Sequence, residues 1–507
     1  MYKRNVIFTL LLLAVSTSFA QDKETPTPQW RPAYHFSPPQ NWTNDPNGLI
    51  YLNGVFNLYY QHNPFENKWG HMSWGHATSK DLINWNNLPV AIPEVVSKDT
   101  TTWIYSGSAV LDKDNTSGFG KNGKAPVVAI FTADQPKQKK ESQYIAYSND
   151  GGISYTQYAG NPVIDLNKKD FRDPNVFWYE PAKQWIMTVA MVDEHMVRIY
   201  GSKNLKEWTK LSDFGPAGTT RNGWECPSLL PLEVDGDPSH IKWVLFVSYF
   251  GDHGPQMQYF IGDFDGIIFK NDNEQDKTLK VDYGDAFYAA IAWRDAPQHK
   301  KILLGWMING KKETYPWKGQ MSIPRDLSIK TTAEGMVLVQ KPSAIVVNSL
   351  SKQAKGRVLV KKNMAIDGSQ ILSKNGLFNQ NSYWINGEFK LGDSKKVGFV
   401  LADQKGLPNG ITIGYDTSRQ ELYLDCTTAE KGNKDAANLI QSAPLKPING
   451  VINIQILLDK SSLEIFGNDG ERVISTMVYP DKESIGISIF SEGKSTINTL
   501  KIWDLHK

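Results

Sequence analysis

The 507-residue chain has very little cysteine, no excess of charge of either sign and, after its first twenty residues, no long apolar run. Only Cys226 and Cys426 are present, so a framework of disulfide bonds does not hold the fold together. The 55 basic and 53 acidic residues give a net charge of +2, which argues against a nucleic-acid partner. The lack of a later apolar run excludes a membrane helix in the body of the chain.

The N-terminus has the pattern of a secretory signal peptide. A basic start precedes an apolar run at residues 6–15, and Ser18 and Ala20 offer small side chains to a signal peptidase. An uncleaved membrane anchor is the alternative. We expect residues 1–20 to be removed and residues 21–29 to form an N-terminal extension. The mature protein is then exported, periplasmic or extracellular, and not inserted in a membrane.

Short β-strand patterns are abundant in the rest of the chain. Alternating or aromatic runs at residues 54–60, 126–131 and 185–190 are bounded by Gly, Pro, Asn and Asp, and no convincing amphipathic helix is found. A polar turn closed by an aromatic residue also recurs, most clearly at residues 79–85 (SKDLINW) and 202–208 (SKNLKEW). The copies lie roughly 60 residues apart, which is the length of one four-stranded sheet with its turns.

Repeats of roughly 60 residues fit about five times into residues 30–340. Sheets that repeat radially protect their edges by closing into a propeller. The sequence therefore predicts an all-β fold with a five-bladed β-propeller, and chance similarity between hairpin turns is the alternative. Residues 341–358 have the character of a linker. Alternation and turn spacing in residues 359–507 predict a C-terminal β-sandwich.

Three acidic residues stand in unusual surroundings, each near the start of one expected blade. Asp45 lies in WTNDPNG (residues 42–48), Asp173 in FRDP and Glu225 in WECP. Asp-Pro and Asn-Gly are also common turn signals, which is the structural alternative for each motif alone. The innermost strands of successive blades surround the axis of a propeller. We therefore expect the three carboxylates to meet at one mouth of the axial channel.

Converging carboxylates match the needs of glycosidic bond cleavage. One carboxylate must be ionised to attack the anomeric carbon, and another must hold a proton for the leaving oxygen. Neighbouring negative charge and partly apolar surroundings raise the pKa of the second group. A separation of about 5 to 5.5 Å between the two predicts a retaining reaction, and a wider gap predicts an inverting one.

Residues 42–48 resemble the W-M-N-D-P-N-G signature of glycoside hydrolase family 32, which includes invertases, inulinases and levanases. Further matches follow in the family's order and cover nearly all of the mature chain. They are Tyr60-Gln61, Trp69-Gly70, WGH at 74–76, SGS at 106–108, RDP at 172–174, ECP at 225–227, DYGDAFYA at 282–289, GWM at 305–307 and LEIFGNDG at 463–470.

The resemblance implies a role for each matching residue. Asp45 resembles the nucleophile that forms a covalent fructosyl-enzyme, and Glu225 resembles the general acid that later serves as base for water. Asp173 resembles the residue that holds the ring hydroxyls and stabilises the oxocarbenium-like transition state. No metal or organic cofactor is implied. The residues implied to line the pocket for the terminal fructosyl unit are Asn44, Gln61, Trp69, Tyr105, Ser106, Arg172 and Trp306.

The resemblance thus implies a retaining glycosidase that cleaves β-D-fructofuranosyl bonds in levan, inulin and their oligosaccharides, with sucrose as a further substrate. Exo release of fructose and endo cleavage of β-2,6-linked levan both stay open. A catalytically inactive carbohydrate-binding propeller is disfavoured because all three carboxylates are present. A related five-bladed hydrolase of arabinan or xylan is disfavoured by residues 42–48. The expected partner is a fructan or fructo-oligosaccharide, and the protein is expected to be a monomer or a homodimer.

Overall fold

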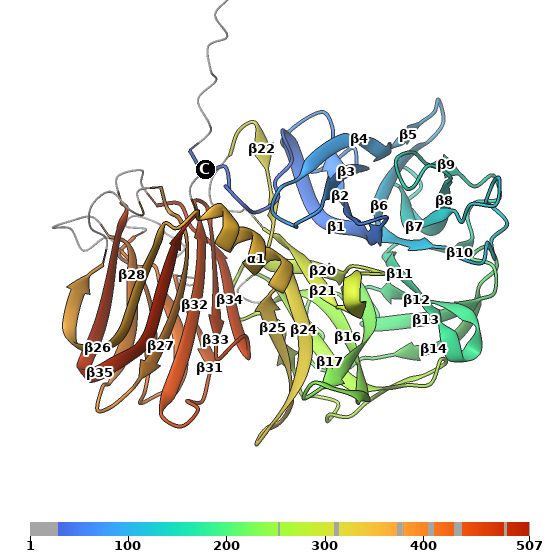
Figure 1. Cartoon of the computed structure of the whole chain (residues 1–507). Helices are drawn as coiled ribbons and strands as arrows, with labels where there is room; N and C mark the ends of the chain where they lie inside the picture. The colour runs from blue at the N-terminus through green and yellow to red at the C-terminus, as the bar shows by residue number, and fades with distance from the viewer. Residues whose placement is uncertain are drawn as a thin grey trace, which may run out of the picture.

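The computed structural model describes residues 29–251, 254–308, 314–372, 378, 380–403, 410–429, 439–480 and 484–505. The predicted signal peptide and nearly all of the predicted N-terminal extension lie outside the described residues. The chain forms a five-bladed β-propeller followed by a β-sandwich, which confirms the predicted fold class (Figure 1). Among the described residues, none of the helices has the length and apolar character needed to cross a bilayer.

The first three blades are antiparallel sheets whose main strands follow one another in chain order. The first blade contains β1 (Asn41–Leu52), β2 (Val55–Asn63), β3 (Ser73–Ser79) and β4 (Asn86–Ile92). The second contains β6 (Thr101–Leu111), β7 (Val127–Gln135), β8 (Lys140–Ser148) and β10 (Ile164–Lys168), with the short β5 (Val95–Val96) and β9 (Thr156–Gln157). The third contains β11 (Phe171–Tyr179), β12 (Gln184–Met191), β13 (Met196–Ser202) and β14 (Thr209–Phe214).

The fourth and fifth blades are linked into one sheet by a single parallel bridge, Val234 to Ile329. The fourth contains β15 (Glu225–Val234), β16 (Asp237–Gly251), β17 (Gly254–Phe264), β18 (Phe269–Asn271) and β19 (Leu279–Lys280). The fifth contains β20 (Phe287–Ala292), β21 (Ile302–Met307), β23 (Gln320–Met321), β24 (Arg325–Thr332) and β25 (Gly335–Pro342). The short 3-10 turns η1 (Glu180–Ala182) and η2 (Pro297–His299) lie in loops of the third and fifth blades.

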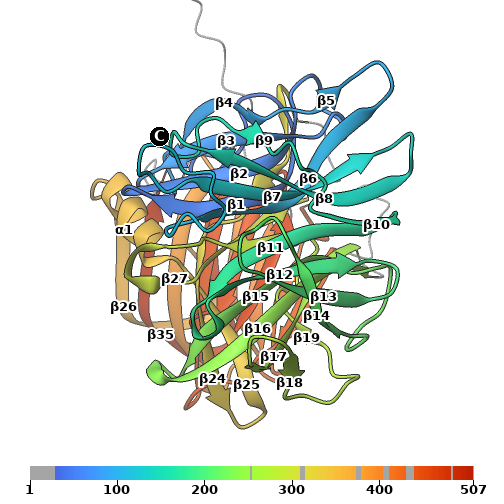
Figure 2. The same ribbon diagram turned by 90° about the vertical axis from the view of Figure 1, so that its right-hand side faces the viewer.

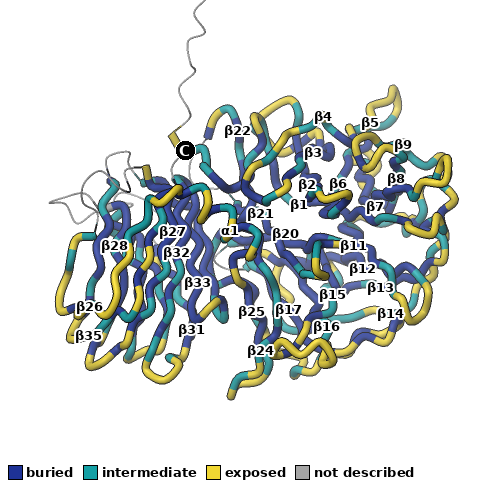
Figure 3. Tube along the Cα trace, in the orientation of Figure 1, coloured by how far each residue is buried: buried dark blue, intermediate teal, exposed yellow. Residues whose placement is uncertain are grey.

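The ring closes through its innermost strands. β1 contacts β6, β6 contacts β11, β11 contacts β15, β15 contacts β20, and β20 contacts β1 again. A short parallel pairing of β22 (Trp317–Lys318) with β1 also ties the end of the propeller to its beginning. Separate apolar clusters fill the space between neighbouring blades. The blades therefore pack face to face, and Figure 2 shows their sheets arranged one after another, while Figure 3 shows that most of their strands are buried.

The sequence repeat is a turn that occurs between the same two strands of successive blades. Asp81, Asp150, Asn204 and Asp265 each accept backbone N–H groups from residues two to four positions further on through the side-chain oxygen. Such a side chain mimics a backbone turn. The four turns connect β3 to β4, β8 to β9, β13 to β14 and β17 to β18. The repeated sequence therefore has a structural role: it forms the turn at the outer edge of these blades.

The C-terminal sandwich is built around two long strands, β26 (Val358–Ile371) and β35 (Gly486–Asp504). The first half of β35 pairs with β28 and its second half pairs with β27, so one strand joins both layers. The remaining strands are β27 (Ser382–Lys390), β28 (Lys396–Asp403), β29 (Ile411–Asp416), β30 (Glu421–Asp425), β31 (Ile440–Pro444), β32 (Val451–Asp459), β33 (Ser462–Gly467) and β34 (Arg472–Met477).

The prediction that the chain has no amphipathic helix is wrong between the two domains. Residues 341–358 contain α1 (Ala344–Gln353), whose buried Val346 and Leu350 pack into an apolar cluster shared by the propeller and the sandwich. A helix of ten residues is marginal by itself and depends on such packing. Two apolar positions four residues apart are too weak a periodic signal to identify it.

Buried charges fasten the propeller to the sandwich. Arg325, fully buried in the propeller, donates to Glu464 and Ser475 of the sandwich and to Asp282 of the propeller. His35 bridges Asp459 and Glu464, with both nitrogen–oxygen distances at 2.9 Å. Burial opposes protonation of His35, but the hydrogen bonds and charges of the two carboxylates outweigh it and raise the pKa of His35 to about 9. The two domains are thus held as one unit.

Candidate active site

The innermost strand of every blade has an irregularity, and the five irregularities lie at about the same height along the channel axis. The antiparallel register slips within β1, β6, β11, β15 and β20, between residues 43 and 46, 104 and 107, 172 and 175, 225 and 228, and 288 and 291. In β11 and β15 a proline, Pro174 or Pro227, lies inside the irregular segment, where its missing N–H removes a ladder hydrogen bond. Asp173, Cys226 and Ala289 also adopt positive φ there. Bulges of this kind redirect side chains, here toward one end of the channel.

The redirected side chains surround a cavity of about 450 Å³. All five blades contribute residues to its wall. All ten residues that the sequence and the family resemblance single out line it together. They are Asn44, Asp45, Gln61 and Trp69 of the first blade, Tyr105 and Ser106 of the second, Arg172 and Asp173 of the third, Glu225 of the fourth and Trp306 of the fifth.

Asp45 lies on β1 and is held by donors on both carboxylate oxygens. The Ser106 hydroxyl donates to Oδ2 at 2.6 Å, and Asn44 Nδ2 donates to Oδ1 at 3.1 Å. Burial raises the pKa of Asp45 above its ordinary value, whereas the Ser106 hydrogen bond opposes the rise and the nearby charge of Glu225 adds to it. Donors that favour the charged form keep this carboxyl group able to ionise in a buried setting. Its fixed orientation suits attack on an electrophile in the cavity.

Glu225 begins β15, and both of its oxygens are held by the walls of the cavity. Arg172 Nε donates to Oε1 at 3.0 Å, and the buried Tyr288 hydroxyl donates to Oε2 at 2.6 Å. The Glu225 side chain is 24% exposed, so it is reachable from the cavity. A carboxyl group that is both fixed and accessible is suited to exchanging a proton with a bound molecule.

Asp173 lies near both other acids and is almost completely buried. Its Oδ2 accepts the backbone N–H of Cys226 at 2.9 Å, and the Cys226 thiol lies within 3.4 Å of the same oxygen and 3.6 Å of Asp45 Oδ2. Burial is the main cause of a raised pKa of Asp173, the charge of Glu225 adds to it, and Arg172 opposes it. Three mutually repelling carboxylates in one cavity favour binding of a group that develops positive charge.

Arg172 connects the acids of this region. Besides Glu225, its Nη1 donates to Glu141 Oε1 at 2.7 Å and to Asp170 Oδ1 at 3.0 Å. Three carboxylates around one guanidinium fix its plane, so the Nε–H that faces Glu225 is held in place. The family resemblance assigns Arg172 to the pocket lining, and the structure adds that it is a positioning residue for Glu225.

Aromatic side chains form part of the cavity wall. The Trp306 ring packs against Trp42 and Tyr288, and its indole Nε1 has no hydrogen-bond partner among the described residues. Trp69 is 51% exposed and lies edge-on to Trp103 at 5.3 Å. The half-exposed Trp69 ring offers a flat apolar surface for stacking, whereas the Trp306 Nε1 is buried in the wall.

Five further residues line the cavity and were not singled out in the sequence. Tyr288 lies inside the motif at residues 282–289, and Asp170 immediately precedes the FRDP motif, so these two could have been found there. Glu141 and Phe250 carry no local signal, because contacts across blades bring them to the site. The five residues are Glu141, Lys169, Asp170, Phe250 and Tyr288.

A propeller whose axial cavity holds three carboxylates, fixed donors and aromatic walls has the parts of a carbohydrate-cleaving enzyme. Models of glycosyl hydrolases family 32 match the chain over almost its whole length, the N-terminal domain at residues 35–342 and the C-terminal domain at residues 347–504. The chain belongs to glycosyl hydrolase family 32 and is a glycosidase. The resemblance seen in the sequence is thereby confirmed.

Characterised proteins of the family are similar to the chain over most of its length. A levanase of Bacillus subtilis is 43% identical over 521 residues, which cover 99% of this chain and 74% of that protein. The crystal structure of an exo-inulinase from Aspergillus awamori has a TM-score of 0.86 at 33% identity and covers 94% of this chain and 98% of its own. A β-fructofuranosidase from Schwanniomyces occidentalis complexed with fructosyl-erythritol has a TM-score of 0.83 at 31% identity, with the same coverage of both chains.

Proposed function

We propose that the protein is a retaining β-fructosidase that removes terminal fructosyl units from levan, inulin and their oligosaccharides. The observation that carries the proposal is that Asp45 of the first blade and Glu225 of the fourth blade, each fixed by two donors, line one cavity. The similarity to levanase and exo-inulinase supports the choice of substrate. Sucrose is a further candidate substrate, supported by the similarity to an invertase.

In the proposed mechanism, Asp45 attacks C2 of the terminal fructosyl unit while Glu225 donates a proton to the leaving oxygen. The covalent fructosyl-enzyme is then cleaved by water, from which Glu225 takes a proton. Asp173 binds ring hydroxyls, and its carboxylate stabilises the oxocarbenium-like transition state electrostatically. Asn44, Gln61, Ser106, Arg172 and the aromatic residues Trp69, Tyr105 and Trp306 complete the proposed substrate pocket.

We propose exo attack because residues of all five blades line the cavity around the channel axis. A pocket lined in this way favours binding of the end of a chain, whereas endo cleavage needs a cleft open at both ends. The alternative is endo cleavage of β-2,6-linked levan. Product analysis distinguishes them: fructose as the only early product supports exo attack, and a ladder of oligomers would require endo attack.

We further propose that residues 1–20 are a signal peptide and that the mature enzyme is exported, where it would meet polymeric substrate. The similarity to extracellular exo-inulinases supports this. The proposed domain limits are 30–340 for the catalytic propeller, 341–358 for the linker and 359–507 for the sandwich. The family match at residues 35–342 supports the limits of the propeller, whereas the match at residues 347–504 begins inside the proposed linker.

The role of Glu225 can be tested by comparing substrates whose leaving groups differ in their need for a proton. Glu225→Gln should lower kcat for sucrose or a fructan by about 10²- to 10⁴-fold, the usual contribution of general acid–base catalysis. Fructosyl transfer from a substrate with a good leaving group, such as p-nitrophenol, needs no protonation, so its first step should be nearly unaffected. Asp45→Asn is the matched comparison and should abolish turnover of both substrates. Equal losses for both substrates in the rate of this first step, measured as kcat/KM or as the burst of released p-nitrophenol, would contradict the assignment of Glu225.

A further inference from the structure

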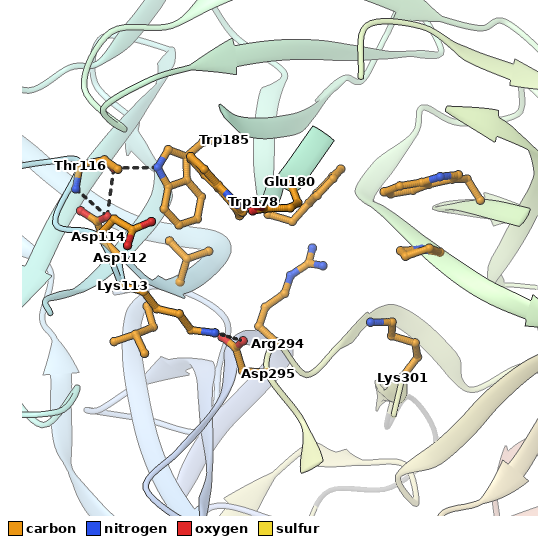
Figure 4. A pocket seen from close by; sticks show the side chains of 15 residues that line it. Asp112, Lys113, Asp114, Thr116, Trp178, Glu180, Trp185, Arg294, Asp295 and Lys301 are labelled. Atoms are coloured by element: carbon orange, nitrogen blue, oxygen red, sulfur yellow. Dashed lines mark hydrogen bonds and ion pairs between the residues drawn. The ribbon is translucent and has the colours of Figure 1, made fainter. Parts of the chain in front are cut away.

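A second cavity, of about 440 Å³, is shown in Figure 4. Its lining residues place it at the other end of the same innermost strands. β11 passes from Asp173 in the first cavity to Trp178 in the second, and β15 passes from Glu225 to Pro231. At about 3.3 Å per residue, five to six residues of strand separate the two cavities by roughly 15 to 20 Å. The second cavity is therefore a separate site at the opposite mouth of the propeller channel.

Two half-buried tryptophans line this second cavity. The indole Nε1 of Trp178 donates to Glu180 Oε2 at 2.6 Å, and the ring meets Trp185 edge-on at 5.0 Å. Trp243 packs against Phe177, with a distance of 5.4 Å between the ring centroids. Both rings are already fixed by packing against their neighbours, so a ligand that binds them loses little free energy to ordering them. Each ring also exposes part of its apolar surface to the cavity.

Polar groups of both signs surround the tryptophans. Arg294 projects toward the middle of the cavity, with Trp178 across from it and Lys301 to one side (Figure 4). The only side-chain hydrogen bond of Arg294 among the described residues goes to the neutral Asn175. Neither the Lys301 ammonium nor the exposed Asp114 carboxylate has a hydrogen bond or ion pair to another described residue. The site thus offers free donors and a free acceptor.

The ligand that fits this combination is neutral and rich in hydroxyl groups. The lining contains four carboxylates and three cationic side chains, so neither an anion nor a cation meets a complementary field. A sugar hydroxyl both donates and accepts and is satisfied by charged groups of either sign. The apolar face of a sugar ring can pack on Trp178 or Trp243.

We propose that this second cavity, lined by Trp178, Trp243, Arg294, Lys301 and Asp114, is a non-catalytic binding site for a segment of the fructan substrate. The inference rests on the proposed function for the identity of the sugar. Binding one segment here raises the local concentration of other chain ends near the catalytic cavity. A polymer or a branched chain can use both sites, whereas a trisaccharide is too short to span them.

The test compares KM for two substrates, levan polymer and a fructan trisaccharide, in the full-length enzyme. Trp178→Ala should raise KM for levan about three- to tenfold, corresponding to about 0.7 to 1.4 kcal/mol of lost binding, with kcat unchanged. The trisaccharide KM and kcat should both be unchanged. Trp178 packs on neighbours, so the double variant Asp114→Ala/Lys301→Ala, which removes polar side chains and no aromatic ring, serves as a second test. Its expected effect is the same in direction.

The matched control is Lys361→Ala/Asp367→Ala, which removes one exposed lysine and one exposed aspartate from β26 of the sandwich. It should change neither KM. An unchanged levan KM in the Asp114/Lys301 variant, or an equal rise for the trisaccharide or in the control, would overturn the second site. Failure of the wild type to hydrolyse either substrate would instead contradict the proposed function.

Discussion

Replacing Ser106 by alanine tests the electrostatic state of the proposed nucleophile. The Ser106 hydroxyl donates to Asp45 Oδ2 at 2.6 Å and holds the pKa of Asp45 down against the effect of burial. A hydrogen bond to a charged group contributes about 1.5 to 3 kcal/mol, and one pKa unit corresponds to about 1.4 kcal/mol. Ser106→Ala should therefore raise the pKa of Asp45 by about one to two units.

The assay is the pH dependence of kcat/KM on sucrose or a short fructan. Asp45 must be ionised to attack, so a higher pKa moves the acid limb of the profile toward higher pH by the same amount, about one to two pH units. At a fixed pH well below the limb, kcat/KM should therefore fall by about 10- to 100-fold. The three acids titrate as a coupled set, so the shift belongs to the macroscopic acid limb. A uniform loss at every pH, with an unmoved limb, would refute the reasoning.

Ser108→Ala is the matched control for this experiment. Ser108 lies two residues further along the same strand, and its hydroxyl donates to the Pro174 backbone carbonyl at 3.1 Å and accepts the Val176 N–H. Its loss also removes a buried hydroxyl from β6 but leaves Asp45 untouched. The acid limb of Ser108→Ala should coincide with that of the wild type. A shift equal to that of Ser106→Ala would show that the strand, and not the hydrogen bond, sets the profile.

Two predictions concern stability. Asp173→Asn should increase the free energy of unfolding near neutral pH by on the order of 2 kcal/mol. Because the pKa of Asp173 is raised in the folded protein, this gain should fade as the pH drops toward the ordinary pKa of 3.8. A gain that does not depend on pH would point to packing instead. His35→Gln should destabilise the protein by about 3 kcal/mol at or below pH 6.5, because the folded pKa is about 9 against an ordinary 6.5. That difference should be lost as the pH rises through about 9, and urea unfolding curves at several pH values measure both effects.

The fold class could be predicted because its signals are local. Alternation marks the strands, and the turn of Asp81 recurs as that of Asn204 because the same Asx turn closes an outer edge in successive blades. The ten candidate residues could be named because each lies in a short motif of the family. Their meeting in one cavity depends on the bulges of the innermost strands, of which only the prolines, as after Asp173, give any sign in the sequence.

Other features could not be predicted because long-range contacts create them. Glu141 reaches the site through Arg172, 31 residues away, and no local pattern indicates that contact. Arg325 and Glu464 form a buried pair across 139 positions and two domains, although the sequence of each strand alone is unremarkable apart from the family motif around Glu464. The helix α1 is short, and its stability comes from the domain interface. The second cavity likewise gathers residues from four blades.

The covalent intermediate provides the most direct test of the account. Glu225→Gln, given a fructosyl donor with a good leaving group, should accumulate a fructosyl-enzyme because no base activates water in the second step. Peptide mapping by mass spectrometry should find one added fructosyl unit on the peptide that contains Asp45, and none in Asp45→Asn/Glu225→Gln. An adduct on another residue, or rapid turnover that releases fructose of inverted configuration without an adduct, would contradict Asp45 as the nucleophile.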